Sequence, residues 1–357
     1  MGQTSYTQTV GDLVASTLQN TRQEVVDNIF RKSAYLAKMA AAGRKKTDEG
    51  GTKLVRSVEY ARNGTVQSFQ GYDQVPIVPQ ETVTDTLWDW KEYAGNWTVS
   101  RRESRINAGS KTRIRDLAAQ KKSSLERSFN ETINEDILNP ASFTAAGNGG
   151  KDLTPLSMLV SLSTSLTVGS IAESSNSWWG NQRLQSVQTN GGTQNGSAVL
   201  KDMRGFYNDC GKHNDGFPDF GIWGKLAVEA YESILDTKVR YGSTEMANMG
   251  FETVYLKGME IAWDQIVPRT SNNGAALVAY NDGTADEECC FFLNTDYIYL
   301  IVDSGTDFVF TPAVNHEANG QYATSGSLLF MGEHICTNRR AQGLYYGFET
   351  VGIALAS

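Results

Sequence analysis

The chain has 357 residues, of which 40% are hydrophobic and 20% charged, so it can bury a large core and has the composition of a globular protein. Its formal net charge is −8, yet residues 1–135 hold 20 Lys and Arg against 16 Asp and Glu, whereas residues 136–357 hold 12 against 24. The first third is therefore suited to face an acidic partner that the remainder repels, although mixed charge on solvated helices explains the pattern equally well.

Several classes of protein are excluded by what the sequence lacks. No apolar stretch approaches the ~18 residues of a membrane-spanning helix, and the polar N-terminus does not resemble a signal peptide. The four cysteines contain no C-x-x-C pair, which disfavours both structural zinc and a disulfide framework. We therefore expect a protein without a membrane segment, made and kept in a cytoplasm.

The first 50 residues combine a predicted helix with a charged link. Apolar residues at helical spacing predict an amphipathic helix over residues 12–42, closed by Gly43. The run that follows contains Arg44, Lys45 and Lys46 beside two acidic residues. It favours a solvated, flexible hinge over a nucleic-acid contact, because three basic residues are a weak footprint for phosphate.

An extended segment comes next, and its first part predicts a hairpin. Residues 54–60 and 66–69 flank Asn63-Gly64, a pair that tolerates the positive φ angles of a tight turn. A two-stranded hairpin is marginally stable in isolation. We therefore expect it to lie on the rest of its own chain or on a neighbouring copy, and Asn63 and Gly64 are candidates for contacts between subunits.

The second part of the extended segment is rich in aromatic residues, namely Trp88, Trp90, Tyr93 and Trp97. Clustered indoles usually anchor a core, but exposed aromatics on a projecting segment mark a protein–protein contact. These four residues are further candidates for contacts between subunits. Whether they pack inward on the chain or outward on the next copy is left open by the sequence.

The longest helical pattern of the chain follows. From Ser110, a good N-cap, apolar residues recur at three-and-four spacing as far as Ile137, and Asn139-Pro140 ends the pattern. A helix of about 28 residues would be about 40 Å long at a rise of 1.5 Å per residue. Such a helix with one apolar face predicts a spine against which a sheet is laid.

The middle of the chain predicts a compact mixed α/β domain over residues 151–290. Residues 224–241 have helical spacing, whereas residues 254–263 are typical of a strand or hairpin. Trp178 and Trp179 could stack on a base or a sugar. The pair is more typical of core or interface anchors, because few nucleic-acid modules lack surrounding basic residues.

The last part of the chain is rich in strands. The runs at residues 289–303, 307–312 and 325–347 are apolar or alternating and are separated by glycine and asparagine turns. Long strands that follow a distant spine helix indicate that the first and last parts of the chain share one domain. The middle domain would then be an insertion between them.

No arrangement of side chains in the sequence predicts catalysis. None of His213, His316 and His334 has a base or metal partner at ligand spacing, and nucleophile-elbow, zincin and dinucleotide-binding motifs are absent. The acidic residues 286–288 lack the alternating ligand order of a calcium loop. We expect no enzyme, no cofactor and no metal; an enzyme with a dispersed active site is an alternative that would rest on the three histidines.

Five segments carry distinctive motifs in a fixed order. They are WDWKEYAGNWTVSRRESRINAGSKTRIRDL, LTPLSMLVSLSTSLTVGSIAESSNSWWGNQ, PDFGIWGKLAVEAYESILDTKVRY followed by GFETVYLKGMEIAWD, FFLNTDYIYL and CTNRRAQGLYYG. Together they resemble the major capsid proteins of tailed bacteriophages, which have the Hong Kong 97-type capsid fold. The resemblance extends from Pro76 to Gly347 and departs from the family pattern at Gly169-Ser170-Ile171 and at Gly332-Glu333.

The resemblance implies an α+β protein in five parts. They are an N-terminal arm (1–52), an extended β-hairpin loop (53–107), a peripheral domain with the long spine helix and a β-sheet (108–150 and 291–347), an axial α/β domain (151–290) and a C-terminal tail (348–357). It implies a major capsid protein that assembles as hexamers and pentamers into an icosahedral shell around packaged double-stranded DNA. Its location would be the capsid of a virion assembled in the host cytoplasm.

The same resemblance implies the partners. The chain would contact itself, a separate scaffolding protein, a portal and a decoration protein, and would touch the packaged DNA only by weak, non-specific contacts. Candidates to face DNA on the inner surface are Arg44, Lys45, Lys46, Lys121 and Lys122. The alternative is a nanocompartment shell of the same fold that encloses a cargo enzyme instead of DNA.

Overall fold

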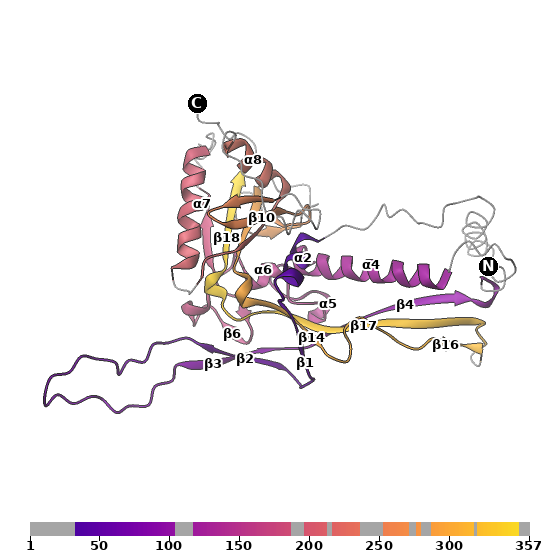
Figure 1. Ribbon diagram of the computed structural model, residues 1–357, viewed down its shortest axis with the longest axis horizontal. Helices are drawn as coiled ribbons and strands as arrows, with labels where there is room; N and C mark the ends of the chain where they lie inside the picture. The colour runs from indigo at the N-terminus through magenta and orange to yellow at the C-terminus, as the bar shows by residue number, and fades with distance from the viewer. Residues whose placement is uncertain are drawn as a thin grey trace. The chain divides into compact units, whose positions relative to one another are not determined.

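The computed structural model describes residues 33–103, 117–186, 196–212, 216–235, 253–270, 276–279, 287–317 and 320–349. These residues form two compact units, and Figure 1 labels many of their helices and strands. The first unit draws its described residues from Glu92–Ile133 and Gly305–Phe330, and the second from Ser33–Lys91, Asn134–Ser304 and Met331–Ser357. The predicted α+β class is confirmed, and the first unit combines early and late parts of the chain.

In the first unit, a long helix packs on several strands. Its elements are β4 (Lys91–Ser100), the start of α4 (Leu117–Leu138), β15 (Val309–Phe310), β16 (Val314–Asn315) and the start of β17 (Ala323–Cys336). β17 pairs with β4 and runs antiparallel to β15 and β16. Helix and strand approach closely at Gly95 of β4, where a Cβ would lie 2.7 Å from Cδ1 of Leu125. The predicted packing of a sheet on the spine helix is confirmed.

The end of α4 is also as predicted. The helix ends at Leu138, and the Asn139 N–H donates to the carbonyl of Glu135 at 2.7 Å before Pro140 prevents continuation. Along the helix, Phe129, Ile133 and Ile137 are buried, which matches the predicted apolar face. The predicted start at Ser110 lies outside the described residues.

The second unit contains a sheet that is eight-stranded among the described residues. Its strands are β7 (Gln182–Gln185), β8 (Phe220–Trp223), β9 (Thr253–Leu256), β10 (Met259–Trp263), β11 (Arg269–Thr270), β12 (Leu277–Val278), β13 (Glu287–Leu293) and β18 (Gly343–Glu349). β13 is antiparallel to β18, β8 and β11, while β18 is parallel to β7 and β8 is parallel to β10. The structure thus places β18 in this sheet, although the predicted boundaries assign 343–347 to the peripheral domain.

Two helices, α7 (Gly196–Gly211) and α8 (Lys225–Leu235), pack on one face of this sheet and share a single hydrophobic core with it (Figure 1). The rings of Phe206 and Phe292 meet edge to face at 5.1 Å. Helix α7 approaches β18 so closely that a Cβ on Gly343 would lie 2.6 Å from Sγ of Cys210. The predicted helix at 224–241 is confirmed as far as Leu235, where the described residues stop.

The predicted strand or hairpin at 254–263 is a hairpin of β9 and β10. Its turn residues, Lys257 and Gly258, have φ angles of 51° and 96°. Positive φ at both central positions is typical of the type I′ turn, whose twist matches that of paired strands. The sequence pattern at residues 254–263 therefore contained both strands and the turn that joins them.

The predicted strand run at 289–303 divides between two sheets. β13 ends at Leu293, and the side chain of Asn294 then accepts a hydrogen bond from the Asp296 N–H to begin a 3-10 turn over Thr295–Tyr297. β14 (Ile298–Asp303) follows and pairs with the end of β17 and, in parallel, with β1 (Lys45–Asp48). The predicted hinge at residues 44–51 is therefore wrong in part, because strand pairing orders a run whose charge pattern indicated solvation.

Before β1 lies a short helix, α2 (Ala34–Ala41), which is capped by the side chain of Ser33 and followed by Gly43 at a φ of 65°. This confirms the predicted end of the first helix. The predicted portion over residues 12–32 lies outside the described residues.

The predicted tight hairpin at Asn63-Gly64 is wrong. β2 (Leu54–Glu59) pairs instead with β3 (Val83–Trp88), and residues 60–82 form a loop between them. The Asn63 side chain accepts a hydrogen bond from the Thr65 N–H at 2.9 Å. A turn signal of this kind can be satisfied by such a side-chain bond without any strand pairing.

The remaining elements of the second unit are short. They are α5 (Gly147–Gly150), α6 (Leu156–Leu159), β5 (Thr167–Val168) and β6 (Ile171–Ala172), with 3-10 turns at Ser177–Trp179 and Arg339–Ala341. The tight turn between β5 and β6 packs on β3, where the Leu87 N–H donates to the carbonyl of Gly169 at 3.0 Å.

Replacing Gly169 by Ala should lower the free energy of unfolding more than replacing Gly71 by Ala. Both glycines have positive φ, 59° and 54°, so both variants carry the strain of a left-handed alanine, about 1 kcal/mol. A Cβ at Gly169 would also lie 2.9 Å from Cζ2 of Trp88, whereas one at Gly71 would meet nothing within 4 Å. The overlap should add about 1–3 kcal/mol, measured by urea unfolding, and equal losses would contradict this packing.

Candidate assembly surface

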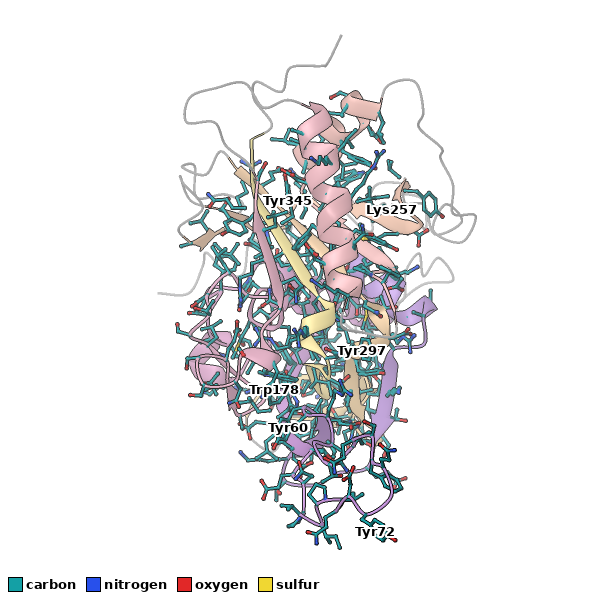
Figure 2. All side chains as sticks on the ribbon, turned by 90° about the vertical axis from the view of Figure 1, so that its left-hand side faces the viewer. Tyr60, Tyr72, Trp178, Lys257, Tyr297 and Tyr345 are labelled. Carbon is teal, nitrogen blue, oxygen red and sulfur yellow. The ribbon has the colours of Figure 1, made fainter. Side chains whose placement is uncertain are left out.

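Large apolar side chains are exposed on the loop between β2 and β3. Phe69 is 65% exposed, Ile77 99% and Tyr72 fully exposed, and Val66, Val75 and Val78 are exposed as well. Figure 2 shows Tyr72 at the far end of the loop, away from Tyr60 where the loop begins. We call residues 66–78 the loop tip. A cluster of exposed apolar side chains of this kind marks a surface that another protein covers.

The base of the same loop is anchored. Tyr60 stacks on Trp178 with ring centroids 5.2 Å apart, and Figure 2 shows the two side by side. Trp88 is only 5% exposed, and its Nε1 donates to Oγ1 of Thr86 at 3.2 Å. Trp179 is buried and donates to the carbonyl of Val168, so the Trp178-Trp179 pair anchors the base, which agrees with the interpretation of the pair as core or interface anchors. A fixed base therefore carries an uncovered tip.

The structure answers the question left open about the aromatic cluster of the arm. In the first unit, the ring of Tyr93 lies 6.1 Å from that of Phe129 on α4, and Trp97 is 6% exposed. In the second unit, Trp88 is buried and Nε1 of Trp90 donates to the carbonyl of Gly51 at 3.0 Å. Trp88 and Trp97 are thus buried in their own chain, while Trp90 and Tyr93 contact it and remain half-exposed.

Sequence reasoning missed the residues that are most exposed. Asn63 and Gly64 do lie on the exposed loop, but Phe69, Tyr72 and Ile77 were not among the predicted contacts. The signal that could have revealed them is the run VPIVP at 75–79, because its prolines cannot donate to a strand ladder and leave apolar residues outside any sheet. The inter-subunit role of all the predicted residues stays a prediction.

The basic residues near the start of the second unit have partners in their own chain. Arg44 forms an ion pair with Asp296, and Nζ of Lys46 lies 4.2 Å from the centroid of the Tyr299 ring. Lys45 is on β1, opposite Leu300. The predicted contact of these residues with DNA stays a prediction.

The two spine lysines are engaged within the first unit. Nζ of Lys121 donates to the carbonyl of Thr98 at 2.9 Å and lies 3.2 Å from Oε2 of Glu103. Nζ of Lys122 lies 4.8 Å from the Trp97 ring. Their role toward DNA also stays a prediction, and any such contact would compete with these bonds.

The described histidines make structural hydrogen bonds. His334 is fully buried, with Nδ1 2.9 Å from the carbonyl of Thr154 and Nε2 2.7 Å from the hydroxyl of Tyr35. Burial lowers the pKa of His334 to about 4, so the ring is neutral at pH 7. His316 lies 2.6 Å from Oγ of Ser325, and His213 is outside the described residues.

Beside His334 lies a second buried titratable group. Glu333 is 1% exposed, and its Oε1 accepts the N–H groups of Thr154 and His334, each at 2.9 Å. Burial raises the pKa of this carboxyl to about 7 and outweighs the opposite effect of the two hydrogen bonds and of Lys91. Glu333 and His334, which are neighbours on β17, thus both form hydrogen bonds with the backbone of Thr154.

Within the described segments, no three His, Cys, Asp or Glu side chains are grouped as metal ligands. In the same segments, no helix combines the length and the hydrophobicity that crossing a membrane requires.

Comparison of the sequence with models of protein families and with curated proteins finds no match. Comparison of the structure does find matches. The chain is similar to the capsid protein of cyanophage A-1(L), with a TM-score of 0.66 and 11% identity over 93% of this chain and 97% of that one. The chain has the Hong Kong 97-type capsid fold. Because the identity is so low, the likeness concerns the fold alone.

Other proteins with the capsid fold match at similar coverage. The capsid of the myovirus XM1 has a TM-score of 0.53 and 11% identity over 94% of this chain and 98% of its own. The holo-SrpI encapsulin complex from Synechococcus elongatus has a TM-score of 0.52 and 8% identity over 97% and 98%. The capsid fold thus joins this chain to both phage capsids and an encapsulin.

Glu333 and His334 should make opposite contributions to the pH dependence of stability. The raised pKa of the Glu333 carboxyl contributes stability that is fully present below pH 4.5, which is the pKa of this group in the unfolded chain. This stability is lost as the pH rises through about 7. The lowered imidazole pKa contributes stability that is present above 6.5 and is lost as the pH falls through about 4. The two contributions oppose each other between pH 4.5 and 6.5.

Replacing Glu333 by Gln should remove one of the two contributions. The free energy of unfolding of this variant, minus that of the wild type, should rise with pH between 4.5 and 6.5 by up to about 1.4 kcal/mol per pH unit. The matched variant His334→Gln should show the opposite trend. Urea unfolding at several pH values measures both, and curves parallel to the wild type would contradict the assignment.

Proposed function

We propose that the chain is a capsid shell subunit that assembles with copies of itself through the loop tip. The observation that carries the proposal is the contrast between the exposed side chains of Phe69, Tyr72 and Ile77 and the anchored base at Trp88. The capsid fold supports it, because similar structures include the capsid asymmetric unit of cyanophage A-1(L) and the capsid of phage XM1.

The geometry of the contact follows from symmetry. A loop tip that rests on a different patch of the next copy makes a heterologous contact, and such contacts close into rings when the rotation between neighbours is an exact fraction of a full turn. A long loop on a fixed base can accommodate the slightly different rotation between neighbours in rings of five and of six. Hexamers and pentamers that close into an icosahedral shell are therefore the assembly that we propose.

For the content of the shell we propose packaged double-stranded DNA of a tailed bacteriophage. The net charge of −8 supports this, because an acidic shell wall repels the phosphates of the enclosed DNA and so does not bind it tightly. The axial and peripheral domains, the separate scaffolding protein, the portal and the decoration protein belong to the same proposal, as does a virion location. The encapsulin match favours the alternative of a compartment around a cargo enzyme.

Replacing Tyr72 and Ile77 together by Ser should prevent particle formation while leaving the subunit folded. Both side chains are essentially fully exposed in the subunit, so their removal costs little folding free energy but deletes the apolar contact with the neighbour. Negative-stain microscopy measures particles and thermal unfolding measures the subunit. The matched variant Tyr72→Phe/Ile77→Val keeps the apolar surface and should assemble.

Trp88→Ala is the contrasting case. Its ring is buried, so truncation should destabilise the subunit by about 3–5 kcal/mol, and any loss of particles should follow from loss of folding. If the serine variant at the tip lost as much folding free energy as Trp88→Ala, or still formed particles, the proposed contact would be wrong.

The content of the shell is tested separately. Particles purified from cells infected with the source phage and treated with nuclease should retain protected double-stranded DNA. Particles that hold a folded enzyme and no DNA would support the compartment alternative and refute packaging.

A further inference from the structure

A polar cleft of about 630 Å³ lies in the second unit, away from the loop tip. It is lined by Thr164, Ser165, Glu173, Ser174, Ser177, Gly180, Asn181, Gln182, Arg183 and Arg340. Trp178, which is labelled in Figure 2, directly follows the lining residue Ser177. None of the lining side chains is apolar, which is unusual because most small-molecule sites are lined mainly by apolar groups. Such a lining is suited to an ion.

Beneath the cleft lies a buried ion-pair network. Arg339 is completely buried; its Nη1 lies 3.1 Å from Oε2 of Glu173 and its Nε donates to the carbonyl of Leu159 at 2.7 Å. Nη2 of Arg183 lies 2.7 Å from the other oxygen of the same carboxylate. Glu173 is itself 5% exposed, so one buried carboxylate serves two guanidinium groups.

The charges at this site do not balance. Arg183, Arg339 and Arg340 contribute three positive charges against the single negative charge of Glu173, which leaves an excess of two. The guanidinium of Arg340 makes no hydrogen bond or ion pair with any residue that the structure describes. Arg340 also lines a neighbouring cleft with Arg62 and Glu59, whose charges cancel.

The cleft also has unused hydrogen-bond donors. Nη1 of Arg183 makes one long bond, 3.4 Å to the carbonyl of Asn181. The exposed hydroxyls of Thr164, Ser174 and Ser177 have no hydrogen-bond partner among the described residues. The wall is tightly built, since a Cβ on Gly180 would lie 2.7 Å from Oε1 of Glu173.

We propose that this cleft binds a phosphate group that is not a diester, as free inorganic phosphate or as the terminal phosphate of a polynucleotide. A phosphate carries about 1.5 to 2 negative charges near pH 7 when it is not a diester, which matches the excess of two, whereas a carboxylate carries one. The planar fork of Arg340 suits two phosphate oxygens, Nη1 of Arg183 has a donor to spare, and the hydroxyls supply the remaining donors. The site lies within one subunit, so it does not depend on shell assembly.

Isothermal titration calorimetry of the full chain in a phosphate-free buffer tests the site, with inorganic phosphate and then acetate as ligands. Arg340→Ala should weaken phosphate binding at least tenfold. Arg204→Ala, which removes an exposed arginine from α7, should leave it unchanged. The proposal would be overturned if the wild type did not bind phosphate, if Arg340→Ala bound phosphate equally well, or if acetate bound as tightly as phosphate.

A second variant tests the site independently, in case Arg340→Ala does not fold. Ser174→Asp adds a negative charge at an exposed position of the cleft and should abolish phosphate binding without loss of folding, as judged by thermal unfolding. A folded Ser174→Asp protein that binds phosphate as the wild type does would also overturn the site.

The source of the phosphate is decided by competition. A DNA duplex with 5′-terminal phosphates is titrated into the protein saturated with inorganic phosphate, and the same duplex without terminal phosphates is the control. Displacement of phosphate from the wild type supports the site with a polynucleotide as its ligand, and retention supports it with free phosphate as its ligand.

Discussion

The close packing of the β5–β6 turn on β3 is the contact on which the proposed assembly depends. The carbonyl of Gly169 accepts the Leu87 N–H, and the missing side chain of this glycine leaves room for the indole of Trp88. Two paired strands alone would be too weak to hold a loop of apolar side chains in solvent. Because Trp88 is buried in the second unit, the hairpin has a fixed base, and only its tip remains for a neighbour.

Buried charge is the second constraint on this unit. Glu333 and His334 share the backbone of Thr154, and burial shifts the pKa of each group toward its neutral form, which lowers the cost of holding the group away from water. Arg339 keeps its charge because Glu173 and several carbonyls surround it. The uncompensated charge that remains lies at a cleft open to solvent, where a ligand can reach it.

Local patterns predicted the elements well and their partners poorly. The periodicity of α4 and its Asn-Pro ending identified a helix that the structure confirms to Leu138. The Asn63-Gly64 signal, equally local, suggested a turn that the chain does not make between strands. The aromatic residues Tyr93 and Trp97 were recognised as a cluster, but whether a ring faces its own core or a neighbour depends on which segments meet it.

The sequence by itself determined the class of fold, the spine helix, the late strands and, through its ordered motifs, the resemblance to capsid proteins, because these depend on periodicity and on residues near one another in the chain. Only the tertiary structure decided that β13 and β14 belong to different sheets, that the loop tip is bare, and that Arg183, Arg339 and Arg340 meet around Glu173. Arg339 and Glu173 are 166 positions apart in the chain, and no local pattern specifies which distant strand or charge will be the partner.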